Sequence, residues 1–529
     1  MAHVHVNDLA YAHPGGDTLF FDVSFRLTAA KHAGLVGVNG VGKSTLLRIA
    51  TGELEADAGD VALGGRALYM PQDVGVGEGT VRELLLSAAP ARLRDAGRAM
   101  LAAERALAAG DAEAGVRLGE AIGAWSDLGG YELEGAWDAA CRRMVRAGLA
   151  DVGDRPAVTL SGGERKRLVL DLLFASDAPI LLLDEPDNFL DVPAKRWLEG
   201  LIRGSRKTVV LISHDRELLT AACDTIVTLE GNGAWVHGGS FASYAQAREH
   251  RQRLMGDRVA RWKEEERRLR ELVRTFKERA KYHDGWAKRA TAMETRWQRW
   301  VDEGPPPAPV VDRTIGVRLR GGDSARRVVA LRGVEIDGLV RPVTEEVHFG
   351  ERVGLIGPNG SGKTHLMRLL AGEAVPHGGQ VVIGNRVSPG LFTQLNARGD
   401  FAGRGVLDIV IDRVGALERA MQALARYGLV EAARRPYETL SGGQRARLEI
   451  LCLELEGHNL LLLDEPTDNL DVASSEALEE ALDGFEGTVI AVSHDRAFLR
   501  TLDRFLLLGH DGGIAALPDA DAALRALGA

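Results

Sequence analysis

Short runs of apolar residues recur along the chain, and the polar positions that follow them form a regular arrangement. The runs GLVGV (34–38), LLL (181–183), TVVLI (208–212) and TVIAV (488–492) each lead into a polar or glycine-rich segment. Apolar runs of this length between turn signals are typical of buried strands. The run STLLRIA (44–50) instead has the length and spacing of a helix. The pattern therefore predicts strands that end in candidate functional loops, one of them followed directly by a helix.

Four sequence blocks occur twice, in the same order. GVNGVGKST (37–45) returns as GPNGSGKTH (357–365), and LSGGERKRL (160–168) returns as LSGGQRARL (440–448). LLLDEP (181–186) and SHDR (213–216) return at 461–466 and 493–496. The last three blocks are displaced by 280 residues and the first by 320. The repeat predicts two domains of one kind, with about 40 extra residues in the first copy.

The extra residues of the first copy fall around 86–131, which is rich in Ala, Leu, Arg and Glu. These are strong helix formers, and Gly110-Asp111 is a turn signal between them. We expect two helices that form a hairpin arm on the first domain.

A second helical pattern joins the two copies. Met255, Trp262, Leu269 and Phe276 recur every seven residues, as do Trp286, Met293 and Trp300, and Pro305-Pro306-Pro307 follows. Heptad spacing predicts two antiparallel helices that share an apolar seam, with a loop at 281–285 and a stop at the prolines. We expect a helical-hairpin linker over 244–312, between domains at 1–243 and 313–529.

Charge sets this linker apart from the rest of the chain. The whole sequence of 529 residues carries a formal charge of −10, yet residues 244–303 hold 17 Lys and Arg against 11 Asp and Glu, a net charge of +6. No run of about 18 apolar residues occurs. The three cysteines are far apart and form no metal-binding or disulfide pattern. The sequence argues against a membrane pore and favours a reducing, cytoplasmic location.

The first repeated block can bind nucleotide phosphates. Gly37-x4-Gly42-Lys43-Ser44 and Gly357-x4-Gly362-Lys363-Thr364 fit a P-loop, in which backbone N–H groups and the lysine hold phosphates and the hydroxyl binds Mg²⁺. The candidate phosphate-binding residues are Gly37, Val38, Asn39, Gly40, Val41, Gly42, Lys43, Ser44, Thr45, Gly357, Pro358, Asn359, Gly360, Ser361, Gly362, Lys363, Thr364 and His365.

Carboxylates, histidines and glutamines after other strands complete a candidate phosphoryl-transfer site. Glu185 and Glu465 are the expected residues that position the attacking water, with His214 and His494 beyond the γ-phosphate. The candidate metal ligands are Ser44, Gln72, Asp184, Thr364, Gln394 and Asp464. A single DEP or a single histidine after a strand is more often structural, and only the repeat reverses that preference.

With these motifs the chain resembles the ATP-binding cassette superfamily, and its two cassettes and basic linker resemble the ABC-F family in particular. The resemblance implies two α/β P-loop cassettes, each with a RecA-like core, an antiparallel β subdomain and a helical subdomain. It implies ATP hydrolysis with Mg²⁺ at two head-to-tail sites within one chain, without an obligate homo-oligomer. It places the signature residues Ser161, Gly162, Gly163 and Glu164 opposite Lys363, and Ser441, Gly442, Gly443 and Gln444 opposite Lys43. Tyr11 is placed to stack on adenine.

The same resemblance implies action on the ribosome. In that family the linker reaches ribosomal RNA and the P-site tRNA, and the arm can meet a ribosomal protein. The candidate RNA-contacting residues at the linker tip are Arg279, Lys281, Tyr282, Lys288 and Arg289. The modest tip favours a general translation factor, with a ribosome-protecting antibiotic-resistance protein or an importer ATPase subunit as alternatives. The absence of a zinc module and of a long coiled coil disfavours a DNA-repair ATPase.

Two departures from the family pattern predict unequal sites. The first copy has DEPDNFLD, with Asp187 and Phe189, where the second has DEPTDNLD. His365 replaces the usual second Thr of the phosphate loop. No aromatic residue lies between Val328 and Val347 to match Tyr11.

Overall fold

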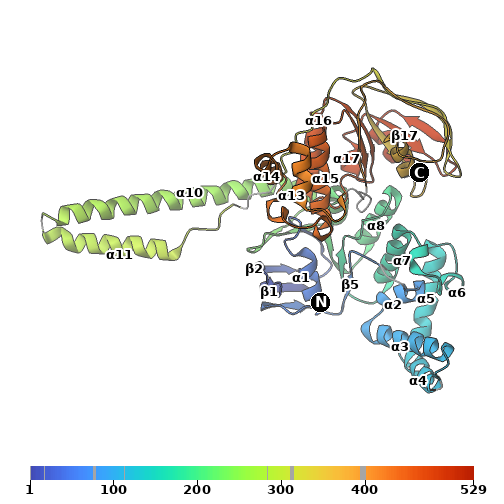
Figure 1. Cartoon of the computed structure of the whole chain (residues 1–529). Helices are drawn as coiled ribbons and strands as arrows, with labels where there is room; N and C mark the ends of the chain where they lie inside the picture. The colour runs from blue at the N-terminus through green and yellow to red at the C-terminus, as the bar shows by residue number, and fades with distance from the viewer. Residues whose placement is uncertain are drawn as a thin grey trace. The chain divides into compact units, whose positions relative to one another are not determined.

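A computed structural model describes residues 2–16, 18–74, 79–111, 113–282, 284–309, 315–393 and 401–528 of the chain (Figure 1). The described residues form two compact units, one of residues 1–238 with 313–529 and one of residues 239–312. The first unit contains both copies of the repeat, and the second is the linker hairpin. None of the described helices has both the length and the apolar character needed to cross a membrane.

The first cassette is built on a six-stranded sheet in the order β5-β6-β7-β3-β8-β9. The strands are β5 Ala67–Met70, β6 Ile180–Asp184, β7 Thr208–Ile212, β3 His32–Val36, β8 Thr225–Leu229 and β9 Ala234–His237, and all neighbours are parallel except β8 and β9. A three-stranded antiparallel sheet accompanies it, formed by β2 Thr18–Leu27, β1 Val4–Ala12 and β4 Ala58–Leu63. Every residue of β6, β7 and β8 is buried, which explains their nearly continuous apolar sequence.

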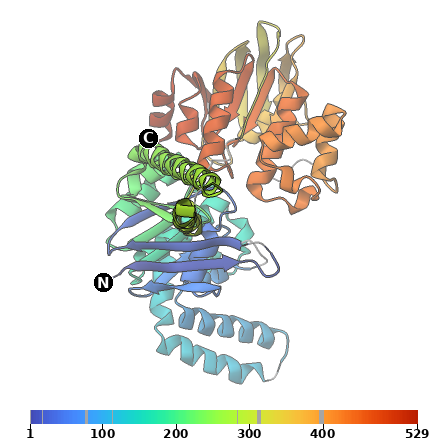
Figure 2. The ribbon, with the colours of Figure 1, turned by 90° about the vertical axis from the view of Figure 1, so that its left-hand side faces the viewer.

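The first cassette also contains a series of helices. They are α1 Lys43–Ala50, α2 Val81–Ser87, α3 Ala91–Ala108, α4 Ala114–Asp127, α5 Gly130–Met144, α6 Leu149–Val152, the 3-10 helix η1 Ala157–Thr159, α7 Gly162–Ala175, α8 Val192–Gly204 and α9 Arg216–Ala222. The two helices expected in the arm are α3 and α4, which pack side by side (Figure 2). Gly110, at the predicted turn between them, has a φ of 89°. Trp125 and Trp137 pack at 5.9 Å in the apolar cluster that joins the arm to the cassette.

The second cassette repeats the architecture. Its six-stranded sheet runs β14-β15-β16-β12-β17-β18, formed by β14 Pro389–Phe392, β15 Leu460–Asp464, β16 Thr488–Val492, β12 Arg352–Ile356, β17 Arg504–Leu508 and β18 Ile514–Leu517. Its antiparallel sheet contains β11 Val340–His348, β10 Arg327–Ile336 and β13 Gly378–Ile383. The helices are α12 Lys363–Leu370, α13 Val406–Val414, α14 Leu417–Arg426, η4 Val430–Ala432, η5 Tyr437–Thr439, α15 Gly442–Glu456, α16 Val472–Asp483, α17 Arg496–Leu499 and α18 Ala520–Leu527.

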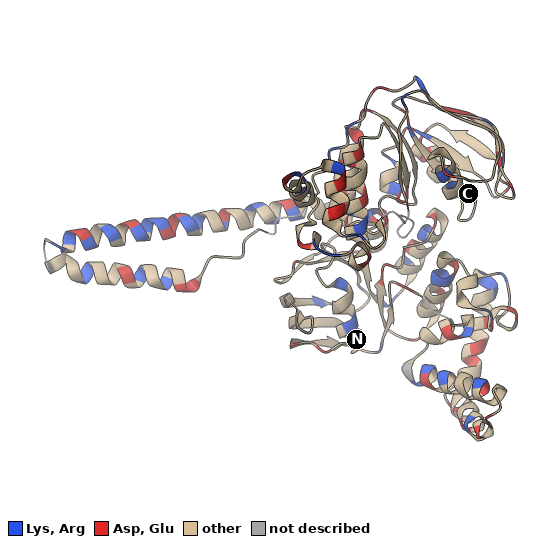
Figure 3. Ribbon diagram, in the orientation of Figure 1, with Lys and Arg blue, Asp and Glu red and all other residues tan. Residues whose placement is uncertain are grey.

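The linker unit is a helical hairpin of α10 Phe241–Ala280, the short η2 Asp284–Trp286 and α11 Ala287–Glu303. It begins before the predicted limit at residue 244, because Ser240 is already the N-cap of α10. Leu269, Val273 and Ala290 are buried between the helices. Trp262 and Trp300 stack with ring centroids 6.3 Å apart, as expected for an apolar seam. Figure 3 shows basic and acidic residues interspersed along both helices.

Candidate active site

The repeated GKS/T blocks form two phosphate loops, each between a buried strand and a helix. β3 leads into α1 in the first cassette, and β12 leads into α12 in the second. Gly42 and Gly362 are the N-caps of these helices and both have a φ of 101°, in the region that favours glycine. A Cβ on Gly42 would also lie 2.7 Å from the side chains of Leu19 and Phe20. The sequence therefore folds a loop whose backbone N–H groups and helix N-terminus can receive an anion.

The loop lysines are buried and bond to their own loops. Lys43 donates to the carbonyls of Gly37 (2.8 Å) and Val38 (3.3 Å). Lys363 donates to the carbonyls of Gly357 (2.8 Å) and Pro358 (2.9 Å). Burial lowers the pKa of both ammonium groups, against the effect of nearby carboxylates. A buried cation in this setting gains stability when a phosphate arrives.

The residues expected to bind Mg²⁺ at the end of β6 fit a hard cation. Asp184 is buried and accepts a bond from the Tyr69 hydroxyl at 3.2 Å. Its second oxygen, Oδ1, has no hydrogen-bond partner among the described residues. Burial raises the pKa of Asp184, while the hydroxyl of Ser44 opposes the shift. Asp464 and Thr364 form the corresponding pair at the end of β15. A carboxylate oxygen beside a P-loop hydroxyl is the oxygen-rich arrangement that Mg²⁺ prefers.

Glu185 bonds to two polar side chains and has an unusual backbone conformation. Its φ is 47°, in the left-handed region, where a non-glycine residue is strained. Its carboxylate accepts bonds from Gln72 (2.5 Å) and from Asn188. Gln72 therefore contacts the expected water-positioning carboxylate directly. Burial, followed by the charges of Asp184 and Asp187, raises the pKa of Glu185 to about 7.

Glu465 is held differently, by the residue expected beyond the γ-phosphate. Its φ is 52°, and its Oε2 accepts a bond from the backbone N–H of His494 at 2.9 Å. The ring nitrogen Nε2 of His494 lies 3.6 Å from Glu465 Oε1 and 3.0 Å from the side-chain oxygen of Asn359. Burial, followed by the charges of Asp468 and Asp464, raises the pKa of Glu465 to about 8. The two cassettes thus hold equivalent glutamates by different partners.

Both site histidines are neutral near pH 7. Burial, with Lys43 nearby, lowers the pKa of His214 to about 3. Burial, followed by the charge of Lys363, lowers the pKa of His494 well below its usual value. His214 Nε2 lies 3.8 Å from Glu185 Oε1. Each neutral imidazole therefore lies beside the expected water-positioning carboxylate.

The LSGG segments begin helices that face the phosphate loops of the opposite cassette. Ser161 and Ser441 cap α7 and α15, and the side chains of Glu164 and Gln444 accept bonds from the serine N–H groups at 2.9 and 3.0 Å. These two side chains are therefore parts of helix caps. The first backbone N–H groups of α7 and α15 can receive an anion.

Two asparagines of the phosphate loops connect the cassettes. Asn39 donates to the Asn469 carbonyl at 2.9 Å, and Asn359 donates to the Phe189 carbonyl at 3.3 Å. A Cβ on Gly443 would lie 2.7 Å from the side chain of Asn39. Each phosphate loop consequently contacts the segment that packs against the other cassette's LSGG turn.

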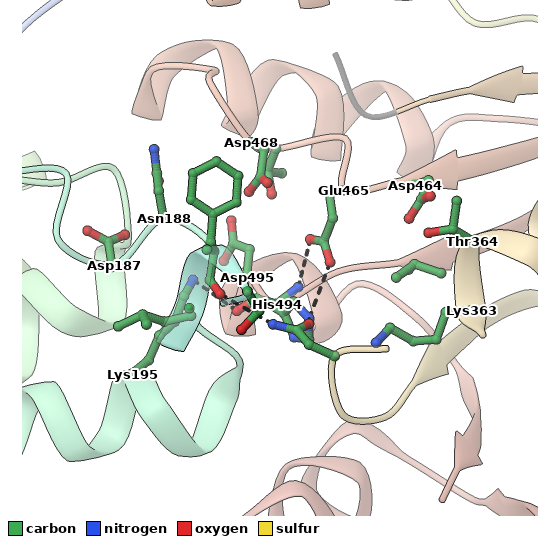
Figure 4. A pocket seen from close by; sticks show the side chains of 18 of the residues that line it. Asp187, Asn188, Lys195, Lys363, Thr364, Asp464, Glu465, Asp468, His494 and Asp495 are labelled. Atoms are coloured by element: carbon green, nitrogen blue, oxygen red, sulfur yellow. Dashed lines mark hydrogen bonds and ion pairs between the residues drawn. The ribbon is translucent and has the colours of Figure 1, made fainter. Parts of the chain in front are cut away.

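A cavity of about 380 Å³ lies between the second phosphate loop and the first LSGG segment (Figure 4). Its wall includes Lys363, Thr364, Asp464, Glu465 and His494 of the second cassette. From the first cassette it includes Ser161, Gly162, Gly163, Asp187, Asn188, Phe189 and Lys195. The predicted phosphate, metal and signature residues of one composite site are thus brought around a single cavity.

Comparison with known proteins agrees with this geometry. The family model described as ABC transporter matches residues 20–188 and 340–468. An antibiotic resistance protein of Mycobacteroides abscessus is 43% identical over 97% of this chain and 98% of its own. ATP-binding cassette sub-family F member 3 of Homo sapiens is 30% identical over 93% of this chain and 71% of its own. This chain belongs to the ABC-F family. It is an ATP-hydrolysing enzyme, and cassettes of this kind bind ATP, generally with Mg²⁺.

Two further comparisons agree with this ABC-F assignment. The tylosin resistance ATP-binding protein TlrC of Streptomyces fradiae is 33% identical over 90% of this chain and 91% of its own. The solved structure of the archaeal ribosome recycling factor aABCE1, in complex with the stalk protein aP1, has a TM-score of 0.60 at 20% identity. It covers 98% of this chain and 92% of that one, and it supports the twin-cassette fold.

Tyr11 of this ABC-F protein was expected at the Lys43 site, whereas the described cavity lies at the Lys363 site. Tyr11, expected to stack on adenine, is only 8% exposed and packs against Phe20 at 6.3 Å in the cassette core. The pairing of β10 with β11 matches that of β1 with β2 when β10 is placed 325 residues after β1, so the counterpart of Tyr11 is the aliphatic Ile336. Gln394 lies outside the described residues.

The expected RNA-contacting residues lie together at the end of the linker hairpin. Tyr282 is 82% exposed. The guanidinium groups of Arg279 and Arg289 lie 5.1 and 4.9 Å from the ring centroid of Trp286. Trp286 also packs against Phe276 at 5.5 Å, which agrees with a role in the seam. Lys281 and Lys288 are exposed.

Two buried lysines of the first cassette were missed by the sequence analysis. Lys166 is 1% exposed and donates to the backbone carbonyl of Glu185. Lys195 is 7% exposed and lines the composite cavity. At a displacement of 280 residues their counterparts are Ala446 and Ser475. Comparison of the two copies residue by residue outside the motifs would have revealed both differences.

Proposed function

We propose that this ABC-F protein binds two ATP molecules between its cassettes and uses their hydrolysis to control its binding to the ribosome. One site would combine Lys43 with Ser441–Gln444, and the other Lys363 with Ser161–Glu164. The observation that carries this proposal is the pair of bonds from Asn39 and Asn359, which connect each phosphate loop to the opposite cassette. Nucleotide phosphates bound in these loops would add contacts across the same interface.

Within each site the residues have separable roles in this proposal. Ser44 with Asp184, and Thr364 with Asp464, would hold Mg²⁺, which when bound neutralises charge on the β- and γ-phosphates. Glu185 and Glu465 would orient the attacking water, each beside a neutral histidine. Gln72, at 2.5 Å from Glu185, would position that carboxylate as well as approach the metal.

The linker hairpin would be the ribosome-binding element. Its net charge of +6 in a chain of −10 supports contact with RNA phosphates. The exposed Tyr282 can stack on an unpaired base, because single-stranded RNA presents its bases to aromatic side chains. The arm formed by α3 and α4 offers a further surface for a ribosomal protein. This function requires a cytoplasmic location.

The effect on the ribosome that we favour is protection against an antibiotic. The names of two relatives, an antibiotic resistance protein at 43% identity and a tylosin resistance ATP-binding protein at 33%, support it. The short linker tip instead favours a general translation factor. The similarity over nearly the full length of both relatives is the stronger argument, and it leaves the importer subunit without support.

A trapped variant tests the proposed function. Glu185→Gln together with Glu465→Gln should remove the water-positioning carboxylates and lower ATP hydrolysis by at least about a hundredfold. ATP binding should persist, so the variant should sediment with ribosomes in ATP and remain in solution in ADP. Hydrolysis at the rate of the unmodified chain would contradict the assignment of the two glutamates.

Drug susceptibility then separates the two ribosomal roles. Expression of the unmodified chain in a susceptible bacterium should raise the inhibitory concentration of a macrolide, whereas the trapped variant should not. Unchanged susceptibility to all ribosome-targeting drugs, combined with ATP-dependent ribosome binding, would favour the translation factor.

A further inference from the structure

The contact between the two cassettes contains a buried group of charged side chains with approximate two-fold symmetry. Arg216 of the first cassette pairs with Glu479 of the second, with Nη1 3.1 Å from Oε2. Arg496 of the second cassette pairs with Glu199 of the first. The members of each pair are related by the 280-residue displacement of the repeat. These reciprocal ion pairs connect the cassettes equally from both sides.

Lys195 breaks this symmetry. It lies in α8, four residues after the helix N-cap Asp191, and its side chain is 9% exposed. The equivalent residue in the second cassette is Ser475, which is also buried and also lines the composite cavity. The two positions are therefore comparable in environment, and only the first carries a cation.

The ammonium group of Lys195 contacts both cassettes. It lies 3.0 Å from Asp215 Oδ2 in its own cassette and donates to the backbone carbonyl of His494 in the other at 3.1 Å (Figure 4). The His494 N–H in turn donates to Glu465 Oε2 at 2.9 Å. Lys195 is thus connected through one residue, His494, to the carboxylate of Glu465, which faces the second phosphate loop. Within the described residues, no such bond joins Ser475 to His214.

A second difference between the copies places an acidic residue near this lysine. Asp187 lies where the second cassette has Thr467, and both residues are buried. Its carboxylate is an electrostatic neighbour of Lys195 and of Lys166. A buried cation without a compensating anion would be strongly destabilising. The acidic residue that departs from the family pattern therefore lies near two buried lysines, Lys166 and Lys195, that have no counterpart in the second cassette.

We propose that Lys195 is a positioning residue, supplied by the first cassette, for ATP hydrolysis in the second cassette's site. It fixes the backbone of His494, and through it the carboxylate of Glu465, only when the cassettes are in contact. The Lys363 site is therefore more strongly coupled to cassette contact than the Lys43 site. This inference rests on the proposed assignment of Glu185 and Glu465 to the two sites.

Single-turnover hydrolysis in full-length chains with one active site tests the inference. Glu185→Gln leaves the Lys363 site competent, and Glu465→Gln leaves the Lys43 site competent. In the first background, Lys195→Ser should lower the first-order rate constant about tenfold, the scale expected for loss of a buried charged hydrogen bond. The ATP concentration for half-maximal rate should change by less than about threefold, because the contacts of Lys195 among the described residues are to Asp215 and His494, outside the phosphate loops. In the second background the rate constant should change by less than about twofold.

Three further variants distinguish positioning from a general structural effect. Lys195→Arg keeps the cation and should keep most of the rate. Lys207→Ser removes a lysine that, in the described part of the chain, bonds within the first cassette, to the carbonyls of Ser176 and Ala178. It should leave the ratio of the two rates unchanged. Exchange of both pairs, with Asp187→Thr, Lys195→Ser, Thr467→Asp and Ser475→Lys, should raise the rate constant of the Lys43 site relative to that of the Lys363 site.

The outcomes separate this inference from the proposed function. If Lys195→Ser lowers both rate constants equally, or neither, Lys195 has no role specific to one site and the inference is wrong. Melting temperatures of all variants identify any loss that arises from unfolding, and Lys195→Arg tests the inference if Lys195→Ser does not fold. If each single glutamine variant still hydrolyses two ATP per chain, the assignment of the glutamates fails, and the inference fails with it.

Discussion

Burial controls the charge of the side chains around both phosphate loops. The pKa values of Glu185 and Glu465 rise to about 7 and about 8, because burial opposes ionisation and neighbouring carboxylates repel a further negative charge. Burial lowers the pKa of Lys43 for the corresponding reason. The protonation states of these site residues are therefore set by burial, and a bound anion or cation would change them. Perturbed ionisation of this kind is typical of catalytic sites.

His214 gives this description a measurable consequence for stability. Its pKa is about 3 in the folded chain, against about 6.5 for an ordinary histidine, so below pH 6.5 the unfolded chain binds a proton that the folded chain does not. The contribution of His214 to the free energy of unfolding is therefore full above pH 6.5 and is lost as the pH falls towards 3. Between pH 7 and pH 5 the free energy of unfolding should fall by about 2 kcal/mol for this reason. His214→Gln should remove this loss.

Calorimetric melting of the nucleotide-free protein checks the prediction. The fall in melting temperature between pH 7 and pH 5 should be smaller for His214→Gln than for the unmodified chain. His250→Gln is a suitable control, because His250 is exposed on α10. An equal fall in all three proteins would show that His214 is not held neutral by the fold.

At the scale of elements, the linker hairpin combines a packed seam with an accessible end. Trp262 and Trp300 stack within the seam, whereas Tyr282 is almost fully exposed. The guanidinium groups of Arg279 and Arg289 both lie over the ring of Trp286, an arrangement that cation–π attraction favours. The two arginines are thus oriented at the tip before any RNA binds, which lowers the entropic cost of binding.

Neutralising the tip should weaken ribosome binding. We expect Arg279→Gln, Lys281→Gln, Lys288→Gln and Arg289→Gln together to lower the affinity of the trapped chain for ribosomes by at least about tenfold, because RNA-phosphate contacts are lost. The dependence of affinity on salt should become shallower by about one logarithmic unit per lost contact. Glutamine keeps part of the aliphatic stem, so packing on Trp286 is only partly reduced.

A matched variant controls for the loss of charge alone. Arg258→Gln, Lys263→Gln, Arg267→Gln and Arg299→Gln remove the same charge from exposed positions elsewhere on the hairpin. This variant should bind ribosomes clearly better than the tip variant, and neither should change the basal ATPase rate. Equal weakening by both variants would mean that the tip has no special role.

At the scale of the molecule, the sequence predicted the features that depend on residues close together in the chain. Lys43, Asp184 and their counterparts follow buried strands, and the parallel sheets bring them to one edge as the motifs require. The heptads predicted the hairpin, and the alanine-rich run predicted the arm helices, since each pattern repeats with its helix. The resemblance to the ABC-F family predicted the identity of the cassettes.

The asymmetry between the sites was only partly predictable. Asp187 differs visibly from Thr467 in the sequence, but its burial and its electrostatic partner Lys195 depend on the tertiary structure. The position of Tyr11 in the core likewise depends on packing of β1 against β2. Such features arise from residues far apart in the chain, which a local pattern cannot relate.

The bonds from Asn39 and Asn359 join two halves of one polypeptide, and this has a consequence for dilution. The linker fixes the local concentration of each half near the other, whatever the number of molecules in solution. ATP hydrolysis per chain should therefore stay constant over about a hundredfold dilution, when measured at saturating ATP. A fall in specific activity at low concentration would instead indicate that two chains assemble to form the sites. A cell that makes few copies of this protein would lose none of its activity per molecule.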